Sequence, residues 1–323
     1  MNSFSTYLFK KFIISVLTIL AITVLVFLIL HLIPGDPVRN MLGETADPEI
    51  VEMKREELNL NKPLVVQYFL WMKDVLRGDF GVSLSQATGD IAEAIKVRLP
   101  VTLGVGIPAI AVATILGLII GIVCANTRGS FIDQFLTVLM TIFEGVPVFW
   151  VSCIVIWLFG QTLGWLPSYG YVSIFESVPE YITHAILPVS VMSMMPMAEI
   201  SRQTRTNMLE VINQDYIRTA RANGLPKRKV LYRHALKNVL IPIVSLLIIQ
   251  IRWVVGGALI TEQIFSINGM GRLIMIAINN NDYQVIQAAT LVLSVIVVGA
   301  NFLLDLVYGW LDPRIRMSQK RAQ

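Results

Sequence analysis

The segment Asp215-Tyr-Ile-Arg-Thr-Ala-Arg-Ala-Asn-Gly-Leu-Pro226 is a basic, polar stretch set between long apolar runs. Residues 201–238 around it carry nine lysines or arginines against two acids. Such a density of positive charge between apolar runs is typical of a loop that stays on the cytoplasmic side of a membrane.

Two short helices separated by a break are expected within the segment. Tyr216–Asn223 contains good helix formers, and Gly224 can adopt the left-handed conformation that ends a helix. Pro226 fits the first turn of a following helix, where a missing N–H costs little. Ala220 and Gly224 lie four residues apart on one face and allow another backbone to approach closely. The residues alone leave two interpretations open, an ordinary charged loop and a docking element for a partner.

Residues Arg218–Gly224, with the sequence R-T-A-R-A-N-G, resemble the loop motif of the dipeptide, oligopeptide and nickel permeases of ATP-binding cassette importers. The more general importer pattern is only partly met, because Arg218 and Thr219 replace its first two residues. The resemblance implies that an ATP-binding subunit docks on this loop. The residues assigned to docking are Arg218, Thr219, Ala220, Arg221, Ala222, Gly224, Leu225, Pro226 and Lys227.

The composition is that of a polytopic membrane protein. The chain has 323 residues, of which 55% are hydrophobic and 15% charged, with a mean hydropathy of +0.66, whereas soluble proteins average about 25% charged residues. Cys124 and Cys153 both lie in apolar runs, so we expect two small buried side chains and no disulfide or metal site.

Six membrane spans are predicted from the apolar runs. The third contains Glu144, Gly145 and Pro147, which suggest a bend, and the fourth is short and is expected to be broken by Pro188 and Pro196. In the second span, small residues every fourth position predict close helix packing. The spans are 13–33, 99–125, 134–159, 184–200, 239–260 and 285–311, and the small residues are Ala113, Gly117, Gly121 and Ala125.

The distribution of basic residues orients the spans. With the N-terminus inside, the inner segments hold sixteen lysines or arginines and the outer segments eight, seven of them in one acid-rich loop. This favours both termini inside and places residues 201–238 in the cytoplasm.

The expected organisation has four parts. Residues 1–33 form the N-terminal segment and first helix, and 34–97 form an extracytoplasmic insert with amphipathic pieces near Glu49–Leu58 and Val65–Leu76. Residues 98–311 form a five-helix core that includes the loop, and 312–323 form a basic tail. Two turns in the insert, at Pro34-Gly-Asp-Pro37 and Gly78-Asp-Phe-Gly81, also resemble the permease family. The apolar runs and this resemblance together predict the fold class of an all-α polytopic membrane protein.

No enzyme site is apparent in the sequence. His31, His184 and His234 do not form a metal-binding pair, and an ordinary surface or interfacial role is expected for each. The Gly-Met-Gly sequence at 269–271 is not followed by the lysine of a phosphate-binding loop. We therefore expect no cofactor on this chain, with ATP and Mg²⁺ bound by partner subunits.

Charged residues inside predicted spans are candidates for the translocation path, because burying charge in lipid is costly. Arg252 shares a helix face with Ser245 and Gly256 and would attract an anionic group such as a peptide carboxylate. The alternative is a structural ion pair with Glu144 or Glu199. Glu144 and the bend at Pro147 are likewise divided between a path role and a structural one.

The sequence thus predicts a permease subunit of an ATP-driven importer in the bacterial inner membrane. The resemblance implies partners: a second permease subunit, two ATP-binding subunits and an extracytoplasmic solute-binding protein, within a lipid bilayer and without nucleic acid. Small peptides, nickel chelates and glutathione are the substrates that it implies. An ion-gradient-driven carrier or channel is the alternative.

Overall fold

The computed structural model describes residues 3–32, 37–43, 45–83, 88–215 and 236–311, together with Ile217, Thr219 and Pro226. Every regular element in these residues is a helix, apart from one isolated bridge between Val82 and Asp90. The all-α prediction is therefore confirmed. The chain divides into two compact units, Met1–Thr102 with Asn268–Phe302, and Leu103–Ile267 with Leu303–Gln323.

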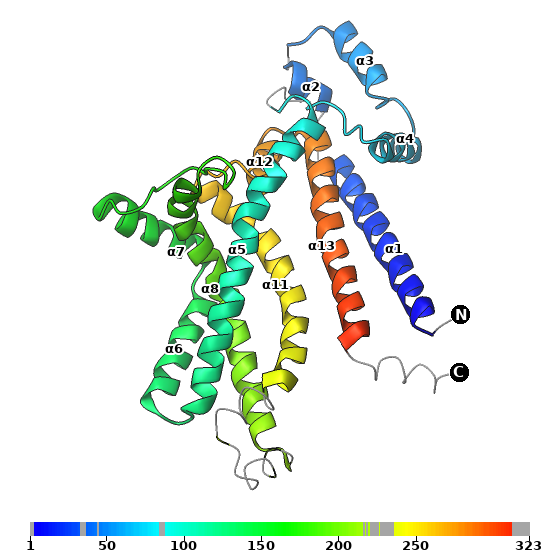
Figure 1. The fold of residues 1–323 in the computed structure, drawn as a ribbon. Helices are drawn as coiled ribbons and strands as arrows, with labels where there is room; N and C mark the ends of the chain where they lie inside the picture. The colour runs from blue at the N-terminus through cyan, green and yellow to red at the C-terminus, as the bar shows by residue number, and fades with distance from the viewer. Residues whose placement is uncertain are drawn as a thin grey trace. The chain divides into compact units, whose positions relative to one another are not determined.

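The first unit is built on two long apolar helices, α1 (Ser3–Leu32) and α13 (Tyr283–Leu311), the latter as far as Phe302 (Figure 1). Thirty residues make α1 about 45 Å long, enough to cross a bilayer. The aromatic rings of Phe12 and Phe302 meet edge to face, with centroids 6.0 Å apart, and join the two helices.

Three short helices lie in the predicted insert: α2 (Pro37–Leu42), α3 (Pro48–Glu57) and α4 (Leu64–Leu76). Asp47 caps α3 by accepting a hydrogen bond from the Glu49 N–H at 3.0 Å. The two amphipathic pieces expected in the insert are confirmed by α3 and α4, whereas α2 was not foreseen.

The insert is attached to α1 through α4. The hydroxyl groups of Tyr68 and Thr23 share a hydrogen bond of 2.8 Å, and the Tyr68 ring meets the edge of Phe27 at 5.5 Å. Thr23 is nearly completely buried, so this bond satisfies a polar group inside an apolar contact.

A further helix, α12 (Met270–Asn279), occupies the segment that was expected to be an outer loop. The Met270 N–H donates to the Thr102 hydroxyl at 2.8 Å, and the buried Ser83 hydroxyl donates to Asp282. Asp282 also accepts from the Val285 N–H at the start of α13. These bonds connect segments of the first unit that are far apart in the sequence.

The second unit contains α6 (Phe131–Gly145), α7 (Val148–Val155), the π-helical turn η1 (Ile156–Thr162), α8 (Val178–Ile212) and α11 (Leu236–Ile264). The helix α5 (Ile91–Asn126) begins in the first unit and ends in the second. α8 packs against both α6 and α11 (Figure 1).

The small-residue face of α5 packs closely on α8, as predicted. A Cβ atom at Gly117 would lie 2.9 Å from the Ile200 side chain, and one at Gly121 would lie 2.6 Å from the Ser201 carbonyl oxygen. Ala113 and Ala125 are buried in the apolar clusters on either side. Only residues with little or no side chain allow this approach.

α8 corrects the prediction of a short, broken fourth span. It continues for 35 residues and passes through both Pro188 and Pro196. Proline removes one backbone donor, but neighbouring helices and local hydroxyl groups can compensate within a packed bundle. The Ser190 and Ser193 hydroxyls donate to the Leu187 and Ser190 carbonyl oxygens, at 2.8 Å each, and not to the two carbonyls that the prolines leave free, so here α8 is held by its packing on α6 and α11.

The bend predicted at Gly145 and Pro147 is confirmed, and it is sharper than a kinked span would require. α6 ends at Gly145, Val146 is extended, and α7 leaves at 105° to α6. The two helices are therefore either a broken span or a re-entrant segment.

Four helical stretches among the described residues are long and apolar enough to cross a membrane, and the α6–α7 pair is a fifth if it crosses once. They are 7–32, 91–126, 178–212 and 283–303. α11 covers the predicted span 239–260.

Candidate functional site

The last turns of α8 lead directly into the basic segment. Ile217 is completely buried and packs with Ala125, Ile200 and Met208, from the ends of α5 and α8. Ile217 lies one residue before the predicted docking motif, so the beginning of the segment is anchored to the helices. Sequence reasoning missed this anchor, although an isolated isoleucine among polar residues was a usable signal.

Two of the predicted docking residues, Thr219 and Pro226, fall within the described part of the chain. Both are exposed, and the Thr219 hydroxyl donates to the Asp215 carbonyl oxygen at 3.0 Å. Exposure is compatible with docking but is also common to any loop. The remaining docking residues, Arg218, Ala220, Arg221, Ala222, Gly224, Leu225 and Lys227, lie outside the described residues.

A buried ion pair joins α6 to α8 beside this anchor. Arg205 donates to Asp133 through Nε and Nη2, both at 2.8 Å. Asp133 is only 3% exposed, and it also accepts from the Gly129 N–H at 3.0 Å. Two parallel hydrogen bonds fix both distance and orientation, so this pair clamps the start of α6 to the last turns of α8. The partners are 72 residues apart, and sequence reasoning did not pair them.

A second pair, between Glu144 and Arg202, joins the same two helices near the bend. This finding removes one of the partners suggested for Arg252. The other, Glu199, accepts a hydrogen bond from the buried Gln250 at 2.8 Å. Arg252 thus forms an ion pair with neither acid in the structure, and its role stays a prediction.

Arg252 lies exposed on α11, and no ion pair between it and another described residue is formed. Gly256, on the same face, has no atom within 4 Å of the position that a Cβ would occupy. Pro147 is exposed at the start of α7. The side chain of Ser245 lies outside the described residues. The second unit therefore leaves Arg252, Gly256 and Pro147 exposed.

The histidines and cysteines are arranged as isolated groups. His31 and His184 each bond a carbonyl oxygen one turn earlier, at 2.7 and 2.8 Å, and His234 lies outside the described residues. Among the described residues, no three His, Cys, Asp or Glu side chains are grouped to hold a metal ion. Cys124 is buried as expected, whereas Cys153 is exposed, because its face of α7 is uncovered in this chain.

A backbone hydrogen bond fixes the loop between η1 and α8, and two tyrosines lie beside it. Tyr181 donates to the Gly104 carbonyl oxygen at 2.6 Å, and the Gly170 N–H donates to Phe265 at 2.9 Å. Burial, together with the neighbouring Tyr181, raises the pKa of Tyr171 above its usual value. The Tyr171 ring meets the Tyr181 ring edge to face, with centroids 6.1 Å apart.

Comparison with known families identifies the chain. Residues 117–317 match the family described as the binding-protein-dependent transport system inner membrane component, and residues 4–105 match the N-terminal region of the same transport components. The chain belongs to this family. It is accordingly a multi-pass protein of the bacterial inner membrane.

Individual relatives resemble nearly the whole chain. The dipeptide transport system permease protein DppB of Alkalihalophilus pseudofirmus is 39% identical, with 96% of this chain and 99% of the relative covered. The oligopeptide transport system permease protein AppB of Bacillus subtilis is 36% identical over the same shares. The family resemblance that the sequence motifs indicated is confirmed.

A solved structure shares the fold. A chain of the MetNI methionine ABC transporter, in an inward-facing conformation, superposes with a TM-score of 0.56 at 17% identity, covering 68% of this chain and 97% of that chain. About two thirds of this chain therefore shares its fold with that transporter chain.

Proposed function

We propose that this permease is one transmembrane subunit of an ATP-driven importer for short peptides. The observation that carries the proposal is the similarity to a dipeptide permease over 96% of the chain. The all-helical fold and the similarity to an importer permease of known structure support it. Nickel chelates and glutathione remain secondary substrate classes from the motif resemblance.

The proposed topology has six spans with both termini in the cytoplasm. The four long apolar helices, the α6–α7 pair and α11 would supply the spans. The excess of basic residues on the assigned inner side supports this orientation. It places α2, α3 and α4 outside and the basic segment inside.

The proposed assembly contains a second permease subunit, two ATP-binding subunits that hold ATP and Mg²⁺, and a solute-binding protein. The ATP-binding subunits would dock on residues 218–227. The anchored Ile217 and the Asp133–Arg205 pair supply a rigid connection, through which a movement of the docked segment reaches α5, α6 and α8. Such rigid-body movement is how transporters alternate access.

The exposed Arg252 is retained as a candidate residue of the path, with Ser245 and Pro147. Its charge on a face that this chain leaves uncovered supports the proposal, because a second permease subunit would enclose that face. Glu144 is better explained by its pair with Arg202.

Purification of the tagged chain from mild detergent tests the assembly, with every co-purifying protein identified and counted. Recovery of two ATP-binding subunits and a second permease per complex is expected, followed by ATP-dependent uptake of di- and tripeptides in proteoliposomes. A chain that purifies alone from several detergents and transports with an ion gradient would establish the carrier alternative.

A Gly224→Asp variant tests the docking role of residues 218–227. It should insert and purify in the same amount but recover fewer ATP-binding subunits, because a bulky charged residue replaces the glycine of the docking motif.

A further inference from the structure

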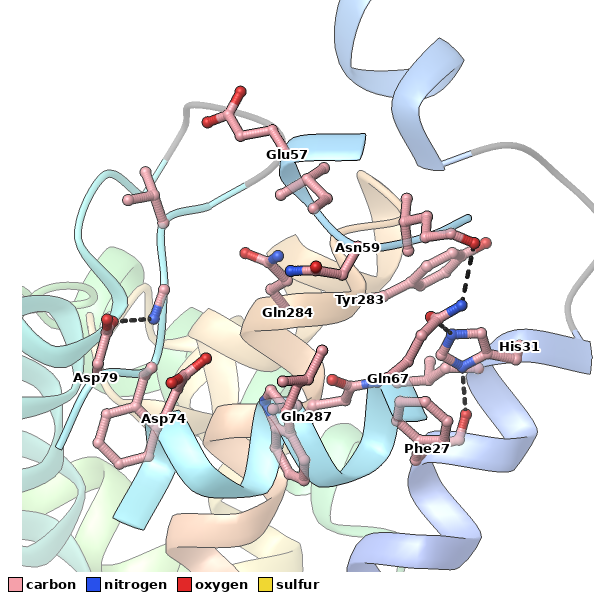
Figure 2. Close-up of a pocket in the computed structure, with 18 of the residues that line it drawn as sticks. Phe27, His31, Glu57, Asn59, Gln67, Asp74, Asp79, Tyr283, Gln284 and Gln287 are labelled. Atoms are coloured by element: carbon pink, nitrogen blue, oxygen red, sulfur yellow. Dashed lines mark hydrogen bonds between the residues drawn. The ribbon is translucent and has the colours of Figure 1, made fainter. Parts of the chain in front are cut away.

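The first unit contains a cavity of about 750 Å³ that the proposed function does not use. Its walls come from the end of α1, the segment after α3, α4, residues 79–83 and the first turns of α13 (Figure 2). This volume lies within the range of small-molecule sites, about 300–1,000 Å³. The lining mixes apolar and polar side chains, as such sites do.

Three polar side chains on the cavity wall lack hydrogen-bond partners among the described residues. The Trp71 indole N–H and the Tyr283 hydroxyl are buried atoms without a partner, and Tyr283 as a whole is only 9% exposed. Gln287 is 7% exposed, and its amide has no side-chain hydrogen bond with the described residues either. Buried polar groups are normally satisfied, so unpartnered groups buried in the wall of one cavity indicate that a ligand or water from outside the chain completes them.

Several other polar groups of the wall are already engaged. His31 bonds the Phe27 carbonyl oxygen through one ring nitrogen and faces Gln67 with the other, at 3.3 Å. The Gln67 amide donates to two carbonyl oxygens, of Leu60 and Lys62. Lys54 is paired with Glu57 at 2.8 Å. These groups shape the cavity but have little capacity left for a ligand.

The remaining charge of the wall is negative. Asp74 and Asp79 lie together at the side of the cavity opposite His31 (Figure 2). Asp79 accepts from the Gly81 N–H at 2.9 Å, and no lysine or arginine among the described residues forms an ion pair with either carboxylate. A cationic group is the ligand that two such carboxylates favour.

We propose that this cavity binds the amino-terminal part of a short peptide. The ammonium group would lie at Asp74 and Asp79, and peptide carbonyl oxygens would accept from the Trp71 N–H and the Tyr283 hydroxyl. Gln287 would bond a peptide N–H or C=O. The choice of a peptide among amine ligands rests on the proposed function, and on the proposed topology the cavity opens outside the membrane.

Direct binding to the permease complex in nanodiscs, without the solute-binding protein, tests this site. Trialanine is titrated while tryptophan fluorescence and heat are recorded. Saturable binding is expected, with a fluorescence change that disappears in Trp71→Phe. Asp74→Asn/Asp79→Asn should weaken binding at least about tenfold, and Tyr283→Phe about threefold to tenfold. Glu56→Gln, an exposed acid outside the cavity wall, is the matched control and should bind normally.

Two ligand controls sharpen the chemistry. N-acetyl-trialanine lacks the ammonium group and should bind as weakly as trialanine does to the double aspartate variant. A simple diamine carries charge without carbonyl groups and should bind weakly but lose its remaining affinity in that variant. Equal binding of the acetylated and free peptides would overturn the proposal, as would unchanged binding in the double variant.

A failure of the proposed cavity site can be distinguished from a failure of the proposed importer function. Absent binding in nanodiscs, with normal peptide uptake when the solute-binding protein is added, would refute the cavity site and leave the importer intact. Binding with the expected variant pattern, without any peptide uptake, would support the site and refute the importer for peptides.

Discussion

The Asp133–Arg205 pair and the cavity of the first unit differ in whether their buried polar groups have hydrogen-bond partners. At the ion pair, the carboxylate is only 3% exposed and accepts three hydrogen bonds from Arg205 and Gly129. In the cavity, a tyrosine hydroxyl and an indole N–H of similar burial have no partner among the described residues. A satisfied buried group stabilises the fold, whereas an unsatisfied one costs stability that only a ligand or water restores. The comparison therefore separates structural from ligand-binding polarity.

The largest effect on stability is expected at the contact between α5 and α8, where the helices leave no space for a larger side chain. Gly121→Leu would place a Cβ 2.5 Å from the Thr204 Cβ and 2.6 Å from a backbone oxygen of α8. The helices must separate, and overpacking of this kind costs about 3 kcal/mol or more. We expect little folded protein by detergent size-exclusion chromatography. Gly257→Leu, where no atom lies within 4 Å of the added Cβ, should purify normally.

Asp133→Ala should destabilise the protein by about 3 kcal/mol, because it leaves the Arg205 guanidinium without its partner in a mostly buried position. The free energy of unfolding in mixed micelles measures this. Glu93→Ala, which removes an exposed pair with Lys96 at 3.7 Å, should change stability by less than about 0.5 kcal/mol. Equal losses in the two variants would contradict the clamp.

Glu144→Gln should cost about 0.5–1 kcal/mol, because its pair with Arg202 is partly exposed to the surroundings. Peptide uptake should remain within about twofold of the wild type after correction for protein amount. A much deeper loss of uptake, with stability retained, would restore the path role that the sequence also allowed.

Tyr283→Phe should have the smallest effect on stability, a change within about 0.5 kcal/mol, since the hydroxyl has no hydrogen bond to lose. Tyr181→Phe is the matched control, because its hydroxyl donates to Gly104 at 2.6 Å and should cost about 1 kcal/mol. A larger loss for Tyr283 than for Tyr181 would show that the comparison between satisfied and open groups is wrong.

Features that depend on residues close together in the sequence could be predicted from it. The four-residue spacing of Gly117 and Gly121 indicated a close helix contact, and turn residues with amphipathic periodicity placed α3 and α4. The loop motif and several smaller motifs identified the family. Each of these depends on residues within a few turns of one another.

Features that depend on distant contacts were not readable. Asp133 and Arg205 meet across 72 residues, and the cavity draws its wall from segments as far apart as Phe27 and Gln287. α8 passes two prolines because its neighbours cover it, which no local propensity reveals. The predicted docking residues lie mostly outside the described part of the chain, so that part of the site stays a prediction.

Because α8 is continuous, a small tilt at one of its ends produces a large displacement at the other. At 1.5 Å per residue, its 35 residues extend about 50 Å, so a tilt of about 5° at one end displaces the other by about 4 Å. Pro188 and Pro196 each remove a backbone hydrogen bond in the middle of this helix, where it is softest in bending. If the basic segment is displaced, as the proposed docking requires, the displacement would reach the nearby α5 and α6 fully and would be reduced by bending beyond the prolines. We therefore expect α8 to be stiffer between the prolines and the basic segment than at the prolines themselves.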